Sequence, residues 1–161
     1  LLMLTATFTG AIISSFEEAL SMYAALIAFI PMLMNTGGNA GGQAGVTVIR
    51  GLSLGEIVYR DVPRIVWKEL RVSLFCGLVL ALVSFGKVLL FDQLGIYVAL
   101  VISLSIIVTV ILAMLVGCLL PILAKRLGFD PAVMANPFIT TIVDALSLIV
   151  YFRMATIILG I

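Results

Sequence analysis

Long uncharged stretches alternate with short charged clusters along this chain, and most of the stretches are long enough to cross a membrane. A transmembrane helix needs about 20 mostly apolar residues, and the charged positions divide the sequence into five candidate segments. We predict helices at residues 1–16, 19–50, 72–91, 96–124 and from 131 to the C-terminal end. The pattern therefore predicts an all-α membrane protein with five transmembrane helices per chain.

Prolines and a polar run mark irregular points within these segments. Pro31 is predicted to kink the second helix, which also contains the polar run NTGGNAGGQ at residues 35–43. Pro131 and Pro137 suit the first turns of the last helix. The connection at residues 50–71 mixes charges with aromatic and aliphatic side chains. It is predicted to be either an interfacial helix on anionic headgroups or a solvated connection.

The composition supports the lipid bilayer as the solvent of this chain. Hydrophobic residues make up 63% of the sequence and charged residues only 11%, whereas soluble domains average about 45–50% and ~25%. The near balance of 9 basic and 8 acidic residues predicts no nucleic acid partner. The sequence contains no histidine, which excludes a histidine-ligated metal site, and both cysteines lie in apolar runs. We interpret these cysteines as small helix residues.

The basic residues predict the orientation of the chain in the membrane. If the N-terminus is cytoplasmic, the segments 50–71 and 125–130 are cytoplasmic too, and only Lys87 and Arg153 of the nine basic residues fall toward the other side. Cytoplasmic loops carry an excess of lysine and arginine. We therefore expect a multi-pass protein of the cell membrane with a cytoplasmic N-terminus and an extracytoplasmic C-terminus.

One carboxylate lies in the middle of the last apolar segment. Asp144 falls within NPFITTIVDALSLIVYF, residues 136–152, and a charge at that depth costs roughly 2.5–3.5 kcal/mol on insertion scales. Asn136, Thr140 and Asp144 are spaced by four, so an amide, a hydroxyl and a carboxylate share one helical face. A structural ion pair is one interpretation, but no basic residue lies deep in a predicted span. A carboxylate without an internal counter-charge favours a transported cation.

A glycine-rich stretch in the second segment is the other candidate feature. In PMLMNTGGNAGGQAG, residues 31–45, the glycines recur every four residues and form two bare stripes on a helix. Such stripes let two helices pack closely, which is one interpretation. The other is an ion path, because amide side chains and backbone carbonyls are groups that a hydrated cation would meet in a pore. The polar residues beside the glycines are Asn35, Thr36, Asn39 and Gln43.

With these two motifs the sequence resembles the MgtE family of magnesium transporters. The stretches WKELRVSLFCGL and LLPILAKRLGFDPA are also similar to that family, and the resemblance covers essentially the whole chain. It implies that residues 1–161 form a transmembrane ion-conducting domain, which assembles as a homodimer with a dimeric pore in the lipid bilayer. The implied transported ion is Mg²⁺, with Mn²⁺ or other divalent cations as alternatives. Family members also carry cytoplasmic N-terminal and CBS domains, so we expect this chain to be a piece of a longer protein.

The resemblance also implies roles for individual residues. By match to the family motifs, Asp144 is the pore aspartate that binds the ion, and Thr140 offers its backbone carbonyl. Four more residues match positions that line the pore: Asn136, Gly37, Gly38 and Asn39. Asp130 matches an acidic residue at the cytoplasmic mouth of the pore.

Three other functions compete with a divalent-cation channel. An ion-coupled secondary transporter of divalent cations is the main alternative, although five spans without a visible inverted repeat argue against it. An intramembrane aspartyl protease needs two carboxylates in one site, whereas each chain offers only Asp144 at depth. We therefore predict that the protein is not an enzyme. A membrane anchor without transport has no need for this aspartate.

Overall fold

The computed structural model describes residues 2–16, 23–132 and 136–160, and within these residues it contains helices and connecting turns but no strand. The elements are α1 (Leu2–Ser15), the 3₁₀ helix η1 (Ala24–Phe29), α3 (Ile30–Ser53), the 3₁₀ turn η2 (Tyr59–Asp61), α4 (Val62–Leu90), α5 (Ile96–Arg126) and α6 (Asn136–Leu159). The all-α prediction is confirmed for the described residues.

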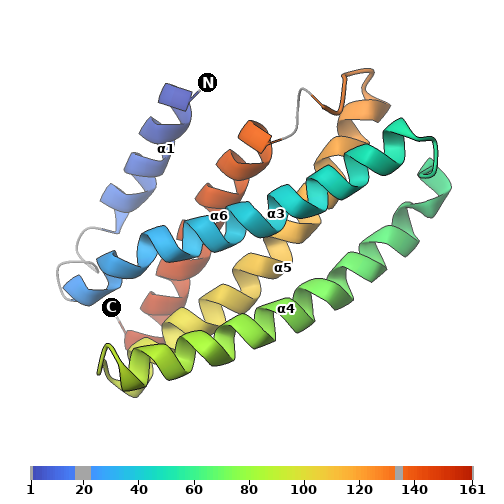
Figure 1. Cartoon of the computed structure of the whole chain (residues 1–161). Coiled ribbons are helices and arrows are strands. Elements are labelled where there is room, and N and C mark those ends of the chain that lie inside the picture. The colour runs from blue at the N-terminus through green and yellow to red at the C-terminus, as the bar shows by residue number, and fades with distance from the viewer. Residues whose placement is uncertain (1, 17–22, 133–135, 161) are drawn as a thin grey trace.

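Helix α5 occupies the centre of the bundle. It contacts α3, α4 and α6, while α1 contacts α6. Figure 1 shows α3, α4 and α6 grouped around α5, with α1 at the edge of the molecule. Small residues on α5, among them Ala99, Ala113 and Gly117, are buried, so its neighbours can pack closely against it.

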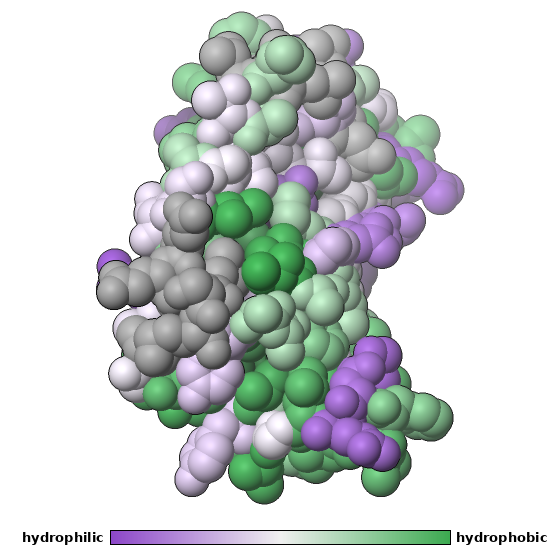
Figure 2. Space-filling view, turned by 90° about the vertical axis from the view of Figure 1, so that its left-hand side faces the viewer, coloured by the Kyte–Doolittle hydropathy of each residue, from purple (hydrophilic) through white to green (hydrophobic). Residues whose placement is uncertain are grey.

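The outer face of α4 is apolar. On α4, Phe75, Leu82 and Val83 are 70%, 73% and 68% exposed. Figure 2 shows a face whose middle is covered by pale and green side chains, with most of the purple hydrophilic side chains along the right-hand edge. Such apolar surface is what lipid-facing helices present.

Three segments of the described residues are long and apolar enough to cross a membrane: Tyr59–Leu90, Ile96–Arg126 and Pro137–Leu159. Helix α1 has only 14 residues. Helix α3 has 24 residues but includes the polar run at 35–43. The count of five spans therefore stays a prediction.

Two of the predicted proline roles are wrong. Pro31 does not kink a continuous helix, because it lies in the first turn of α3, directly after η1. A proline suits that turn, where its missing N–H would have no intrahelical acceptor. Pro131 lies in a turn, and α6 begins only at Asn136. In that turn the Asp130 carboxylate accepts a hydrogen bond from the Ala132 N–H at 2.9 Å, the bond of an Asx turn.

Other helix ends follow local sequence signals. Pro63 and Pro137 lie in the first turns of α4 and α6. At the end of α5, Gly128 adopts a φ of 82°, a conformation that glycine reaches without steric cost. The Phe129 N–H then donates to the Ala124 carbonyl at 2.9 Å, which closes the last turn of the helix.

The connection between α3 and α4 is shorter than the sequence pattern predicts. Helix α4 begins at Val62, so residues 62–71 continue directly into the apolar part of this helix. Residues 54–61, including η2, form the connection itself. Tyr59 and Trp67 are exposed, as membrane-interface aromatics are. A separate interfacial helix over 50–71 is therefore wrong.

Helices α3 and α5 cross with their backbones in contact. A Cβ atom added to Gly117 would overlap the carbonyl group of Gly41, and one added to Gly41 would lie 2.9 Å from the Ala113 carbonyl oxygen. Gly37 and Gly45, on the same stripe of α3, are also buried. The packing interpretation is confirmed for this stripe.

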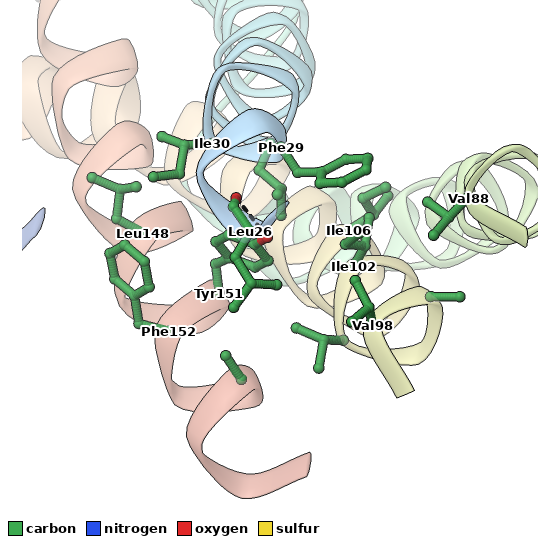
Figure 3. Close-up of a cluster of buried hydrophobic side chains, with 14 of the residues drawn as sticks. Leu26, Phe29, Ile30, Val88, Val98, Ile102, Ile106, Leu148, Tyr151 and Phe152 are labelled. Carbon is green, nitrogen blue, oxygen red and sulfur yellow. Dashed lines mark hydrogen bonds between the residues drawn. The ribbon is translucent and has the colours of Figure 1, made fainter. Parts of the chain in front are cut away.

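A buried hydrogen bond joins α6 to the segment that leads into α3. The Tyr151 hydroxyl donates to the Leu26 carbonyl at 2.9 Å, and both residues are fully buried. Figure 3 shows this bond as a dashed line inside an apolar cluster that includes Leu148 and Phe152 of α6. The bond positions the start of α3 against α6, and these two helices carry most of the candidate site.

We expect Tyr151→Phe to lower the free energy of unfolding by about 1 kcal/mol, because the Leu26 carbonyl would lose its buried donor. Denaturant or thermal unfolding in detergent micelles measures this change. Tyr97→Phe is the control, since Tyr97 is 64% exposed at the start of α5. Equal stability of the two variants would contradict a structural role for the Tyr151 bond.

Candidate ion-binding groove

A groove of about 520 Å³ lies between α3 and α6. From α6 it is lined by Thr140 and Asp144, and from α3 by Pro31, Met34, Asn35, Gly38, Asn39, Gly42, Gln43 and Val46. The groove therefore brings together the two sequence motifs, which are separated by about a hundred residues in the chain.

Helical periodicity explains which α3 residues face this groove. Asn35, Asn39 and Gln43 are exposed and recur every four residues, and Gly38 and Gly42 form the stripe beside them. Side chains four apart lie above one another on a helix. The Asn39 amide donates to Asn35 Oδ1 at 3.2 Å, so neighbouring amides also order each other. The result is a polar strip along one side of α3. The opposite side of α3 packs against α5.

Asp144 places its carboxylate beside the glycine stripe of α3. A Cβ atom added to Gly38 would lie 3.9 Å from Asp144 Oδ1 and 3.6 Å from the Thr140 methyl group. Asp144 is partly buried. It follows Asn136, the first residue of α6, by two turns, or roughly 12 Å along the helix at 1.5 Å per residue. The carboxylate therefore lies inside the helical bundle rather than at the end of α6.

Within the described part of the chain, no basic side chain forms an ion pair with Asp144. Lys87 instead pairs with Asp92 at 2.7 Å, and its ammonium lies 5.3 Å from the centre of the Phe29 ring. Arg153 is exposed. A structural ion pair at Asp144 therefore has no partner among these residues, which leaves the carboxylate open to a cation in the groove.

The Thr140 side chain makes a local contact on α6. Its hydroxyl donates to the Pro137 carbonyl at 3.3 Å, and the Thr141 hydroxyl donates to the same carbonyl at 2.7 Å. Thr140 and Thr141, about one turn before Asp144, thus both donate to the Pro137 carbonyl. A role for the Thr140 backbone carbonyl in binding the ion stays a prediction of the family resemblance.

Three of the predicted site residues are not placed among the groove-lining side chains. A Cβ atom added to Gly37 would lie 2.8 Å from both Ser147 Oγ and Val143 Cγ1, so Gly37 faces the packed side of α3. Asp130 is exposed in the turn after α5 and does not line the groove. Asn136 begins α6, but its side chain lies outside the described part of the structure.

The groove also contains polar residues to which the resemblance assigned no role. Asn35 and Gln43 line it, and their signal in the sequence is the spacing of four on either side of Asn39. Thr36 belongs to the same polar run but does not line the groove. One residue on a helix rotates the side chain by roughly 100°, so sequence neighbours point to different faces.

The donor groups of the groove are oxygen atoms of a carboxylate and amides, which hard divalent cations prefer. Among the residues that the structure describes, no three His, Cys, Asp or Glu side chains cluster as a metal site. The groove therefore offers one carboxylate and several amide oxygen atoms to a cation.

Comparison with known proteins decides the family. The family model for MgtE, described as a divalent cation transporter, matches residues 30–154, which include every residue that lines the groove. This chain belongs to the MgtE family. Together with the apolar helices, membership of the MgtE family makes the chain part of a membrane protein.

Similar proteins within the MgtE family come from several bacteria. The chain is 37% identical over 159 residues to the magnesium transporter MgtE of Thermus thermophilus, covering 99% of this chain and 35% of that protein. It is 37% identical over 163 residues to the protein of that name from Bacillus subtilis, covering 97% and 34%. The corresponding values for Enterococcus faecalis are 32% identity over 148 residues, 92% and 32%. The chain thus spans about a third of the length of the curated relatives that it matches.

Proposed function

We propose that this chain forms the ion-conducting membrane domain of a Mg²⁺ transporter, with the groove between α3 and α6 as half of its pore. The observation that carries the proposal is Asp144, a carboxylate with no ion pair among the described residues, in a groove lined by amide side chains. The similarity of this chain to proteins named magnesium transporters supports Mg²⁺ as the cation.

The open side of the groove supports a homodimer. Asn35, Asn39 and Gln43 are exposed, and polar groups facing hydrocarbon without partners are costly. A second copy related by a two-fold axis would cover both polar strips at once, because a two-fold interface pairs the same surface of each subunit. Two Asp144 carboxylates would then face one dication across a polar channel.

We propose that Mg²⁺ passes Asp144 with most of its water shell in place. Direct coordination of Mg²⁺ demands a nearly octahedral set of oxygen atoms at about 2.0–2.1 Å, and the ion gives up water reluctantly. Two carboxylates and a few amides are better suited to hold the ion through bridging waters. Loose binding also lets the ion leave, as conduction requires.

Mg²⁺ uptake into liposomes that contain the full-length protein tests this function. We expect uptake that the hexaammine complex of cobalt(III) inhibits, because this complex resembles hydrated Mg²⁺ in size but cannot exchange its ligands. A bulkier complex of the same charge, tris(ethylenediamine)cobalt(III), is the control and should inhibit more weakly. Absence of Mg²⁺ uptake would reject the transport function, whereas uptake that neither complex inhibits would reject the hydrated ion.

We also propose that the chain lies with its N-terminus and the α3–α4 connection in the cytoplasm. Lys125 near the end of α5 donates to the Leu52 carbonyl near the end of α3 at 2.9 Å, so both helices end on one side of the bundle together with their basic residues Arg50 and Arg126. The excess of basic residues on that side favours the cytoplasm. Cytoplasmic N-terminal and CBS domains, as the MgtE resemblance implies, would regulate the pore from there, near Asp130.

Cysteine labelling tests this orientation. In a background without Cys76 and Cys118, Gln93→Cys should react with an impermeant maleimide added outside the cell, and Ser53→Cys should not. Both positions are exposed, Gln93 after α4 and Ser53 at the end of α3. The reverse labelling pattern would overturn the proposed orientation.

A further inference from the structure

A second groove, of about 860 Å³, lies on a different face of the bundle from the ion-binding groove. Its floor is one face of α5 between residues 112 and 123, with Val62 and Pro63 of α4 on one side and Ile142 of α6 on the other. The two grooves share no lining residue. On α6, Ile142 and Asp144 are two residues apart, so their side chains point to nearly opposite faces. The second groove is therefore not part of the proposed ion path.

The second groove is about as long, along α5, as one membrane leaflet is thick. From Leu112 to Arg126 the helix rises roughly 21 Å at 1.5 Å per residue, which is about half of the ~40–45 Å thickness of a bilayer with its headgroups. Helix α5 is itself long and apolar enough to cross a membrane and ends at Arg126. The groove thus extends from near the middle of the bilayer to its surface, which is the depth that an acyl chain occupies.

The lining changes character at the surface end. Along the floor it is made of apolar side chains, among them Leu115, Val116 and Leu119. At the end of α5 the lining includes Arg126, and the η2 turn contributes Tyr59, which is 51% exposed. An apolar floor with a cationic end matches the distribution of polarity along an anionic phospholipid.

Arg126 is available for an anion. Within the described residues its guanidinium takes part in no ion pair or hydrogen bond. The adjacent Lys125 differs, since it donates to the Leu52 carbonyl at 2.9 Å. Guanidinium groups bind phosphate through paired hydrogen bonds, and tyrosine side chains favour the headgroup level of a bilayer. Arg126 and Tyr59 therefore form a headgroup site at the mouth of an apolar groove.

We propose that this groove binds one anionic glycerophospholipid from the leaflet on that side of the membrane, with an acyl chain along α5 and the phosphate at Arg126. Inorganic phosphate would leave the apolar floor empty. A second copy of the chain would gain more by covering the exposed amides on α3. The bound lipid contacts Ile142, so it touches the helix that carries Asp144.

Tryptophan quenching by brominated lipids tests the proposal. Trp67 is the only tryptophan of this chain, so we would replace it, and any further tryptophan of the expressed protein, by phenylalanine. Tyr59→Trp then places a reporter in the groove, and Phe75→Trp, at a position 70% exposed on α4 outside the groove, reports on bulk lipid. In mixed vesicles, we expect brominated phosphatidylglycerol to be preferred over brominated phosphatidylcholine about tenfold at the groove reporter, which is about 1.4 kcal/mol, and not at the bulk reporter.

Changes at Arg126 identify the headgroup contact. Arg126→Gln should remove the preference at the groove reporter, and Arg126→Lys should retain most of it, because the charge is kept. Equal preference at both reporters, or an unchanged preference in Arg126→Gln, would overturn the proposal. So would displacement of the lipid by inorganic phosphate. Disulfide cross-linking of two copies through Leu119→Cys, in a background without the native cysteines, would assign the groove to a second copy instead.

Discussion

Asp144→Asn is expected to lower Mg²⁺ uptake into liposomes by at least roughly a hundredfold. The substitution keeps the shape of the side chain and removes the charge that faces the groove. A unit charge about 5 Å from a dication contributes several kcal/mol at an effective dielectric constant near 20, and about 1.4 kcal/mol corresponds to a tenfold change. In a homodimer the substitution removes two such charges at once.

The matched control is Glu56→Gln, which removes an exposed carboxylate in the connection between α3 and α4, away from the groove. This variant should transport Mg²⁺ like the wild type. Gel filtration and circular dichroism would establish that both variants fold and assemble equally. Unchanged uptake by Asp144→Asn, in a folded protein, would reject Asp144 as the central ion ligand.

Gly117→Ala is expected to have the largest effect on stability. The added methyl group would overlap the Gly41 carbonyl of α3, and a backbone atom cannot move aside as a flexible side chain can. Overpacking of this kind costs typically 1–3 kcal/mol and occasionally more, and we expect about 3 kcal/mol here. Because α3 must shift away from α5, the position of Gly38 beside Asp144 should change as well, so Mg²⁺ uptake should fall along with stability.

Gly86→Ala provides the control for Gly117→Ala. Gly86 also lies within a helix, α4, but a Cβ atom there would meet nothing within 4 Å. Alanine has a higher helix propensity than glycine by about 1 kcal/mol, so this variant should be as stable as the wild type or more stable. If unfolding in detergent micelles showed Gly117→Ala to be as stable as Gly86→Ala, the close crossing of α3 and α5 would be contradicted.

The helical nature of the chain could be predicted from the sequence because it depends on local pattern. A run of apolar residues without charges forms a helix in a bilayer whatever its neighbours are, since its backbone groups must be paired internally. The start of a helix is harder to predict. Pro31 and Pro131 are equally compatible with a first turn, a kink or a preceding turn, and the choice depended on η1 before α3 and on the Asp130 turn before α6.

The candidate site was predictable in part. Asp144 stands out alone because a carboxylate in an apolar segment is costly. The sequence does not show which glycines of α3 line the groove, because both glycine stripes have the same spacing of four. Either stripe could pack against another helix or face an ion path. The crossing of α5 assigns Gly41 to packing, and the position of α6 assigns Gly38 to the groove.

The sequence by itself determined that the chain is helical, that it is apolar enough for a membrane, that it resembles the MgtE family and that Asp144 is its unusual charge. Only the tertiary structure decided which face of α3 meets Asp144, that Gly37 faces the packed side, and that α5 forms an apolar groove ending at Arg126. The physical reason is that hydrophobicity and charge are properties of single segments, whereas a groove depends on the crossing of helices that are far apart in the chain. That crossing is set where glycines let the backbones of α3 and α5 touch.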